Sequence, residues 1–446
     1  MKTDSATPRP RLPRPLQGAD LLGLSRLGFD AALGVVDLVE AMHHTIASRA
    51  GIVGATPAGR PSGITGFVYG AVRGSTRVVG LGLNTLLGAV TGPAQHEQTT
   101  PRREALLAAL NGVWGDHLAD SGNPLAITSS LRVGGRSLDF TQPLAAQLPA
   151  TASKGAQGRI LVLAHGLCMS DLQWARKGHD HGAALARDAG WTPVCLHYNS
   201  GRHVSQNGRD FAALLEQLVL AWPVPVKELA ILGHSMGGLV ARSACQLAKA
   251  GGEVSAKAGA KAGGEAGAEA GGAGGEAGKD AGGPAWLKKL KRIVFLGTPH
   301  HGAPLERGGR LVDTLFGVSP YVRPFARLSK ARSAGITDLR YGNLQDADWQ
   351  GRDRHSQRHD DRVPTPLPAG VQAFVVGATT GDHVGSVRSR VVGDGLVPLA
   401  SALGEHRQPT LALGVPEARR LVVCSANHWD LLDRADVYGA LRQWLV

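Results

Sequence analysis

Cysteine is scarce in this chain, which has four cysteines among 446 residues. They lie far apart, on predicted strands, a helix and one loop, and none forms a Cys-x-x-Cys pair. This is the pattern of small buried hydrophobic residues in a reducing compartment, and it argues against a disulfide framework. Since no cluster of histidines accompanies them, we expect no metal site. The four residues are Cys168, Cys195, Cys245 and Cys424.

A secretory signal is also missing from the sequence. Residues 1–19 are polar and rich in proline, and they lack the apolar core that such a signal requires. We therefore predict a disordered N-terminal tail and a cytoplasmic protein that is not exported by that route.

Signatures of nucleic-acid binding are absent despite a formal net charge of +12. The sequence contains no RNP, zinc-finger or helix-turn-helix pattern. A positive excess of this kind favours anionic surfaces such as phospholipid head groups. We expect no nucleic-acid partner, and a peripheral contact with membranes is an open alternative.

Apolar residues recur at helical spacing in the N-terminal region, and we predict a helical extension over 20–120. Within it, 64–91 is an apolar stretch with glycines at every fourth position, which lets two helices approach closely. Arg73 and Arg77 interrupt this stretch, and charge is costly in lipid. The pattern favours a helical hairpin, packed on the rest of the protein or lying at a membrane surface. A membrane-spanning hairpin is the alternative, and a further helix is predicted at 103–110.

From 121 to 446 the sequence has the pattern of one α/β domain. Short continuous apolar runs alternate with helical segments, which marks strands buried on both faces of a parallel sheet. We predict a mostly parallel, doubly wound sheet with helices on both faces. The predicted strands are 126–133, 136–140, 159–164, 192–197, 228–232, 292–296, 371–376 and 420–424, and the predicted helices are 181–189, 207–221, 236–249 and 433–445.

The segment 250–284 breaks this pattern. It consists of glycine, alanine, glutamate and lysine in an imperfect repeat, and its largest apolar residue is Val254. Such a segment cannot bury enough surface to fold. We predict a disordered insertion in a loop of the α/β domain.

The most informative stretch reads Ile-Leu-Gly-His-Ser-Met-Gly-Gly over 231–238. A predicted strand precedes it and a predicted helix follows, which is the setting of a Gly-x-Ser-x-Gly nucleophile elbow. A serine in this strained turn needs residues without side chains two positions before and after it, and Gly233 and Gly237 meet that need. We predict Ser235 as a nucleophile. A serine that only caps the following helix is the alternative.

A nucleophilic serine needs a base for its proton and an acid that orients the base. In this arrangement the acid and then the histidine follow the serine along the chain, each in a loop after a strand. His428 follows the last predicted strand, and Asp394 lies in the glycine-flanked loop after the strand 371–376. Asp382 is the alternative acid, and Asp430 is expected to begin the last helix.

An acyl-transfer site also needs backbone N–H groups for the developing oxyanion. We predict that Met236, directly after the nucleophile, supplies one. Leu167, in the loop after the strand 159–164, is predicted to supply the other. We expect His165 to brace this loop and Cys168 to fill space beside it.

Several motifs recur together: His-Gly-Leu after a strand, Gly-His-Ser-Met-Gly-Gly, Gly-Thr-Pro-His-His-Gly at 297–302, Gly-Asp-Gly-Leu-Val-Pro, and a final Asn-His. In this combination the chain resembles α/β-hydrolase lipases and esterases over residues 155–446. The closest resemblance is to bacterial triacylglycerol lipases and GPI-inositol-deacylase-like proteins. It implies the α/β-hydrolase fold, a cap or lid within 303–368, and a place for His300 and His301 at the pocket rim rather than as the base.

These observations predict a serine carboxylester hydrolase that acts on a lipid-like or short acyl ester through an acyl-enzyme, without a cofactor. Two alternatives remain. One is an acyltransferase that uses the same triad and passes the acyl group to an alcohol. The other is a binding or scaffold protein that has kept the hydrolase fold without the chemistry.

Overall fold

The computed structural model describes most of the predicted α/β domain and little of the region before it. The predicted tail 1–19, the apolar stretch 64–91, and 304–332 and 353–359 of the predicted lid region 303–368 lie outside the described residues. The described residues are 20, 22–23, 25–27, 100–148, 156–265, 283–303, 333–352, 360–383 and 392–446, with the backbone alone at 102 and 251–265.

The chain folds into two compact units. The first comprises Met1–Gln98 and Asp120–Ala126. Within it the Asn123 amide donates a hydrogen bond to the Gly23 carbonyl oxygen (3.1 Å). The second comprises Thr99–Ala119 and Ile127–Val446 and contains the sheet. Among the described residues, no helix is both long and apolar enough to cross a membrane.

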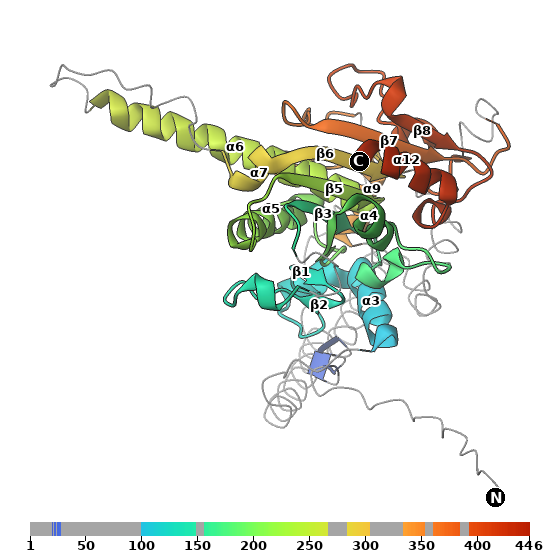
Figure 1. Cartoon of the computed structure of the whole chain (residues 1–446), viewed down its shortest axis with the longest axis horizontal. Coiled ribbons are helices and arrows are strands. Elements are labelled where there is room, and N and C mark those ends of the chain that lie inside the picture. The colour runs from blue at the N-terminus through green and yellow to red at the C-terminus, as the bar shows by residue number, and fades with distance from the viewer. Residues whose placement is uncertain are drawn as a thin grey trace, which may run out of the picture. The chain divides into compact units, whose positions relative to one another are not determined.

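The second unit is built on an eight-stranded sheet in the order β2-β1-β4-β3-β5-β6-β7-β8 (Figure 1). The pairs β1–β2 and β1–β4 are antiparallel, and every later pair is parallel. This mostly parallel sheet with crossover helices confirms the predicted α/β-hydrolase fold class. The strands are β1 Ser130–Val133, β2 Arg136–Ser137, β3 Arg159–Ala164, β4 Thr192–His197, β5 Glu228–His234, β6 Leu290–Leu296, β7 Gln372–Ala378 and β8 Arg420–Val423.

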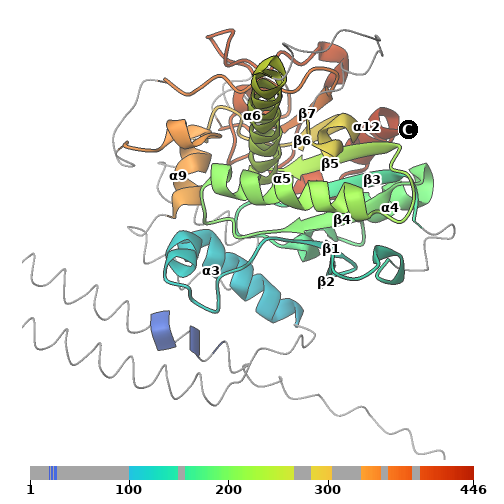
Figure 2. The ribbon, with the colours of Figure 1, turned by 90° about the vertical axis from the view of Figure 1, so that its left-hand side faces the viewer.

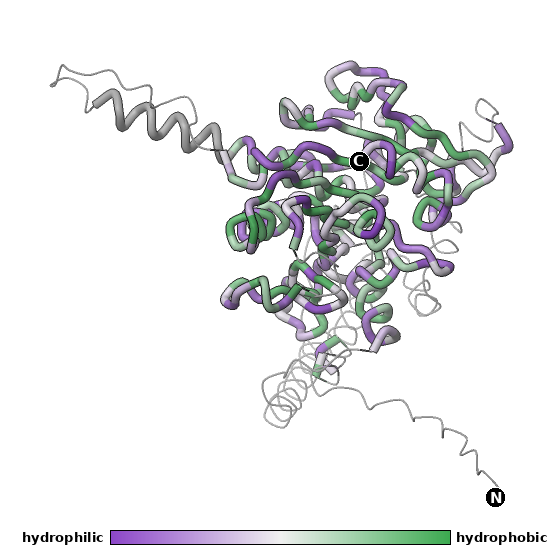
Figure 3. Tube along the Cα trace, in the orientation of Figure 1, coloured by the Kyte–Doolittle hydropathy of each residue, from purple (hydrophilic) through white to green (hydrophobic). Residues whose placement is uncertain are grey.

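Both faces of the sheet are buried, as the continuous apolar runs predicted. Hydrophobic residues recur along the strands and helices of this unit (green in Figure 3). In β3, Ile160 and Val162 pack into one core cluster, whereas Leu161 and Leu163 pack into the other, because successive side chains of a strand point to opposite faces. Helices α5 and α6 pack side by side, and so do α4 and α12 (Figure 2). Side chains of α5 and α6 belong to the first cluster, and those of α4 and α12 belong to the second.

The helices of the second unit mostly follow the predicted segments, with differences at their ends. The N-terminal helix continues well beyond the predicted 103–110, and the last helix begins at Ala435 rather than 433. The described α-helices are α3 Pro101–Asp120, α4 His181–Ala189, α5 Val204–Ala221, α6 Met236–Glu265, α7 Ala285–Lys289, α9 Ala334–Tyr341, α11 Leu399–Ala402 and α12 Ala435–Leu445.

Helix α6 differs from the prediction for the segment 250–284. Its backbone remains helical to Glu265, where we expected no folded structure. Alanine, lysine and glutamate have high intrinsic helix propensity, whereas the glycines of this stretch oppose a helix, so composition alone does not explain its length. Residues 266–282 lie outside the described part of the chain.

The register of the strands brings several loops to one edge of the sheet. Ala164 of β3 lies opposite Gly233 of β5, and His234 lies opposite Leu296 of β6. Strands β7 and β8 run parallel to these and end toward the same edge. The ends of these five strands and the segments that follow them carry all the predicted site residues.

Candidate active site

Ser235 occupies a strained turn between β5 and α6. Its φ is +54°, in the left-handed region that a non-glycine residue adopts at a cost of about 1–2 kcal/mol. The turn is held by a hydrogen bond from the Ser235 N–H to the Leu296 carbonyl oxygen (2.9 Å). Ser235 is 6% exposed, so its side chain lies in a nearly enclosed position. This is the geometry of a nucleophile elbow.

The glycines around Ser235 are required by close backbone contacts. A Cβ atom at Gly237 would lie 2.1 Å from the Ala164 carbonyl oxygen, and one at Gly233 would lie 2.7 Å from the Cα of Gly238. A Cβ at Gly238 would meet the Thr298 hydroxyl oxygen at 2.1 Å. Backbone atoms cannot yield at such distances, so larger residues at Gly233 and Gly237 would displace the elbow.

The loop after β3 lies directly against the elbow. A Cβ at Gly166 would be 3.1 Å from the Cβ of Ser235. The next residues turn sharply, since Cys168 has φ +59° and its N–H donates to the Ser200 hydroxyl (3.1 Å). The N–H groups of Leu167 and Met236 have no acceptor among the contacts of the described residues. Both groups therefore remain available to an external acceptor.

His165 has the surroundings of a bracing residue. Its Nδ1 lies 2.9 Å from the Gly166 carbonyl oxygen, and its ring stacks on Tyr198 at 4.4 Å between centroids. The Tyr198 hydroxyl donates to the His165 carbonyl oxygen (2.8 Å). Burial lowers the pKa of His165 to about 4, so the imidazole is neutral near pH 7. Cys168 fills space against Gly112, and burial raises the pKa of its thiol to about 12.

Asp394 and His428 form a buried pair. The His428 Nδ1 lies 2.6 Å from Asp394 Oδ2, and the exposed fractions of the two side chains are 1% and 0%. The other carboxylate oxygen accepts the N–H groups of Leu396 (2.9 Å) and Val397 (2.8 Å). A further bond joins the His428 N–H to the Asp394 carbonyl oxygen (3.1 Å). The carboxylate is thus fixed by backbone donors and in turn fixes the imidazole.

The second ring nitrogen of His428 is left without a partner in the described part of the chain. Nε2 is buried and has no hydrogen-bond partner among the described residues. Because Asp394 accepts at Nδ1, the proton of the neutral ring resides there and Nε2 carries the lone pair. A nitrogen in this state is ready to accept a proton.

His234 links the elbow to His428, and the sequence reasoning assigned it no role. It directly precedes Ser235, its Nε2 lies 3.3 Å from the His428 carbonyl oxygen, and the two rings are 4.7 Å apart. Burial and the neighbouring His428 hold the pKa of His234 well below its usual range. The neutral ring can therefore donate to that carbonyl. His428 therefore lies beside His234, the residue directly before the turn at Ser235.

The alternative acids lie in other environments. The Asp382 carboxylate interacts with the Ser425 hydroxyl at 3.4 Å near the surface. We expected Asp430 to begin the last helix, but that helix begins at Ala435. Asp430 begins a separate 3-10 turn, Asp430–Leu432, in which its carboxylate accepts the Asn427 N–H (3.0 Å). The cause is local, since this side chain caps the turn that carries His428.

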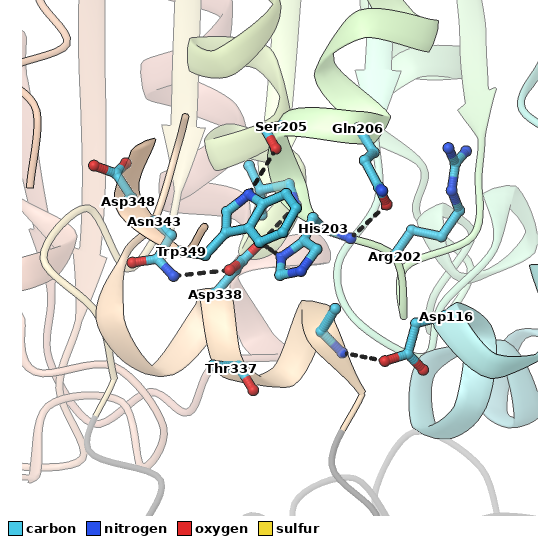
Figure 4. A network of polar contacts seen from close by, with 12 residues as sticks. Asp116, Arg202, His203, Ser205, Gln206, Thr337, Asp338, Asn343, Asp348 and Trp349 are labelled. Atoms are coloured by element: carbon cyan, nitrogen blue, oxygen red, sulfur yellow. Dashed lines mark hydrogen bonds and ion pairs between the residues drawn. The ribbon is translucent and has the colours of Figure 1, made fainter. Parts of the chain in front are cut away.

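A second buried carboxylate–imidazole pair, Asp338 with His203, escaped the sequence reasoning (Figure 4). The His203 Nδ1 lies 2.9 Å from Asp338 Oδ2, and the ring stacks on Trp349 at 3.6 Å between centroids. Asp338 also accepts the Val204 N–H (2.8 Å) at the start of α5 and the Asn343 amide (2.8 Å). The pair ties α9 to the N-terminus of α5.

Potential metal ligands do not gather in the parts of the chain described here. No group of three or more histidine, cysteine, aspartate or glutamate side chains is arranged to hold an ion there. His300 and His301, in the loop after β6, instead contact arginines. The Arg242 guanidinium lies 3.3 Å from His300 Nδ1, and that of Arg362 lies 3.2 Å from His301 Nδ1.

Comparison with known proteins gives lipases and esterases among the similar solved structures. The mature lipase BlEst2 of Bacillus licheniformis is 16% identical, with a TM-score of 0.38, over 65% of this chain and 92% of that one. Lipase B of Aspergillus fumigatus is 13% identical, with a TM-score of 0.36, over 65% of this chain and 53% of that one. A thermophilic esterase of Thermogutta terrifontis is 14% identical, with a TM-score of 0.34, over 65% of this chain and 90% of that one.

No protein-family model matches the chain, and no curated protein matches it. The similarity to the solved structures is too distant to carry information about the reaction. Strand order and burial therefore define the fold, and the contacts around Ser235 and His428 define the candidate site.

Proposed function

We propose that the protein is a serine carboxylester hydrolase with Ser235 as nucleophile, His428 as base and Asp394 as the acid that orients it. One observation carries the proposal. A fully buried carboxylate holds an imidazole whose other nitrogen is unpartnered, and this imidazole lies against the residue preceding a strained serine.

The reaction follows from these positions. The Ser235 hydroxyl oxygen attacks the ester carbonyl carbon while its proton passes to His428 Nε2. The Asp394 carboxylate stabilises the imidazolium that forms. The carbonyl oxygen becomes an oxyanion, and the N–H groups of Leu167 and Met236 donate to it.

Collapse of this intermediate breaks the bond to the alcohol oxygen. His428 returns the proton to that oxygen, the alcohol leaves, and an acyl group remains on Ser235. Water then attacks the acyl-enzyme in the same way, with His428 again accepting a proton, and the carboxylic acid is released. The substrate class is a lipid-like or short acyl ester.

Substitution of the nucleophile tests the proposal. We expect Ser235→Ala to abolish covalent labelling by a fluorophosphonate probe and to lower p-nitrophenyl ester turnover by at least about 10³-fold. Ser129→Ala is the matched control, because Ser129 is half-buried and bonded to Asp210, and it should retain both signals. Labelling of the Ser235→Ala protein at the wild-type level would exclude Ser235 as the nucleophile.

A panel of p-nitrophenyl esters of increasing acyl length then defines the substrate class. A product assay with an added alcohol separates hydrolysis from acyl transfer, since a transferase forms a new ester and a hydrolase forms only the acid.

A further inference from the structure

The turn that carries Leu167, one of the two proposed oxyanion donors, contains a strained residue. The Met169 N–H donates to the Gly166 carbonyl oxygen (3.3 Å) and closes this turn. Its third residue, Cys168, has φ +59°, a backbone conformation that type II turns require and that glycine or asparagine normally supplies. A cysteine in this position needs contacts from outside the turn to hold its backbone there.

One such contact comes from the segment after β4. The Cys168 N–H donates to the Ser200 hydroxyl oxygen (3.1 Å), and Ser200 is 1% exposed. This N–H belongs to the central peptide group of the turn, whose orientation distinguishes a type II turn from a type I turn. The Ser200 hydroxyl therefore fixes the peptide group directly after Leu167.

The second contact comes from the backbone of α3. A Cβ atom at Gly112 would lie 2.2 Å from the Sγ of Cys168, 2.9 Å from its Cα and 3.0 Å from its amide nitrogen. The Cys168 thiol also contacts the Ala109 carbonyl oxygen, three residues earlier in the helix, at 3.9 Å. The α3 backbone thus closes the space into which the strained residue would otherwise relax.

The same helix holds the segment that carries Ser200. The Asn199 side-chain amide donates to the Gly115 carbonyl oxygen (2.8 Å), and its amide oxygen accepts the Gly201 N–H (3.1 Å). A Cβ at Gly201 would lie 2.1 Å from the Asn111 carbonyl oxygen. Helix α3 belongs to the same compact unit as the sheet, and it contacts both the strained turn and the segment that anchors it.

We propose that Ser200 is a positioning residue of the oxyanion site and that the stretch Gly112–Gly115 of α3 supports it. The Ser200 hydroxyl and the helix hold the turn in the conformation that presents the Leu167 N–H beside Ser235. The inference rests on the proposed ester hydrolase function. It gives a part in the reaction to α3, which the sequence pattern assigned to an extension before the α/β domain.

The effect should appear in the transition state, because the oxyanion forms only as the serine adds to the carbonyl. Ser200→Ala should lower kcat/KM for p-nitrophenyl esters by about 10- to 100-fold. A trifluoromethyl ketone adds to the serine and carries the same oxyanion, so its inhibition constant should rise by a similar factor. An ether of the same chain length has no carbonyl, and its inhibition constant should change less than about twofold. Equal losses for ketone and ether would overturn the inference, since a general disturbance of the pocket affects both.

A compensating substitution tests the route through the turn. Glycine adopts a positive φ without strain, so Ser200→Ala combined with Cys168→Gly should be at least about threefold more active than Ser200→Ala alone. Ser243→Ala is the matched control, because it removes another buried serine hydroxyl, which donates to the Leu344 carbonyl oxygen (2.7 Å), and it should retain kcat/KM. An unchanged kcat/KM in folded Ser200→Ala, an equal loss in Ser243→Ala, or a double variant no more active than the single one would contradict the positioning role.

The nucleophile variant separates this inference from the function on which it rests. Ester turnover that survives in Ser235→Ala would remove the hydrolase proposal, and this inference with it. If Ser200→Ala does not fold, a crystal structure of the wild-type protein with the bound trifluoromethyl ketone decides. We expect its oxyanion within hydrogen-bond distance of the Leu167 N–H, with the Cys168 N–H still bonded to Ser200. An oxyanion bound elsewhere on a modified Ser235 would overturn the positioning role and leave the hydrolase proposal intact.

Discussion

Two buried carboxylate–imidazole pairs lie in the same unit of this protein, and they differ in what surrounds the ring. Asp394 with His428 has a separation of 2.6 Å, and Asp338 with His203 has one of 2.9 Å. Both carboxylates are fully buried. The two pairs are thus similar in distance and in the burial of the carboxylate, although the His203 side chain is 14% exposed and that of His428 is 1% exposed.

The two pairs differ in what surrounds the imidazole ring and its second nitrogen. The His203 ring is stacked on Trp349, and its carboxylate also caps the first turn of α5 through Val204. The His428 ring instead has a buried, unpartnered Nε2 and contacts the residue before the strained serine. A free ring nitrogen beside the serine is what we expect of a catalytic pair, whereas the Asp338–His203 pair has both partners engaged in packing and capping.

The largest expected difference between the pairs is in catalysis. Asp394→Asn should lower kcat by about 10⁴-fold, equivalent to about 5 kcal/mol in the barrier, because an amide no longer fixes the tautomer of His428. Asp338→Asn is the matched control and should change kcat less than tenfold in folded protein. Steady-state ester hydrolysis measures both, and equal losses would remove the distinction between the pairs.

The second difference is in stability. Asp338→Ala should lower the free energy of unfolding by about 3–5 kcal/mol, because it leaves the buried Val204 N–H and the His203 and Asn343 side chains without an acceptor. Urea denaturation followed by circular dichroism measures the change. A loss below about 1 kcal/mol would show that this pair contributes little to the fold.

The pH dependence of stability tests a third group of histidines, which are buried without a carboxylate bond. Burial lowers the pKa of His165 and of His181 to about 4, against 6.5 in the unfolded chain. The unfolded state therefore binds more protons between these values, and stability is lost as the pH falls from about 6.5 to about 4. Each histidine contributes up to about 1.4 kcal/mol per pH unit within this window. Urea midpoints that do not change between pH 7 and pH 4.5 would contradict these assignments.

The smallest expected effect concerns the stacking of the His203 ring on Trp349. Trp349→Leu should destabilise the protein by about 1 kcal/mol or slightly more, because it removes the aromatic stack on His203 and the bond from the indole N–H to Ser205. Trp349→Phe keeps a stacking ring and loses only that bond, so its unfolding midpoint should lie between those of the wild type and Trp349→Leu. The reverse order would show that the stack does not stabilise His203.

Much of the fold was accessible from local patterns. The predicted bounds of β3, β4 and α4 agree with the structure, because continuous apolar runs and a helix with clear capping residues depend on neighbours in the sequence. The full length of α3 was missed, since the helix passes through a non-helical residue, Trp114. The continuation of α6 to Glu265 was missed because this glycine-rich segment has no large apolar residue and was therefore expected not to fold.

The candidate site was accessible in part. Ser235 and its glycines stand in one motif, and Asp394 and His428 follow strands whose ends were predicted. The contact of His234 with His428 was not predicted, because the only sequence feature that marked His234 was its position before Ser235. Outside this site, the burial of Arg242 against the loop after β6 had no signal in the sequence, because it depends on how distant segments pack.

By itself the sequence determined the alternation of strands and helices and the strained turn at Ser235, because both depend on residues adjacent in the chain. The order of motifs predicted that His428 meets Asp394, whereas only the tertiary structure decided that His203, another of the 17 histidines, meets Asp338. The two pairs join residues 34 and 135 positions apart, and such contacts depend on the order of strands in the sheet and on the loops that leave its edge. No local preference specifies that order.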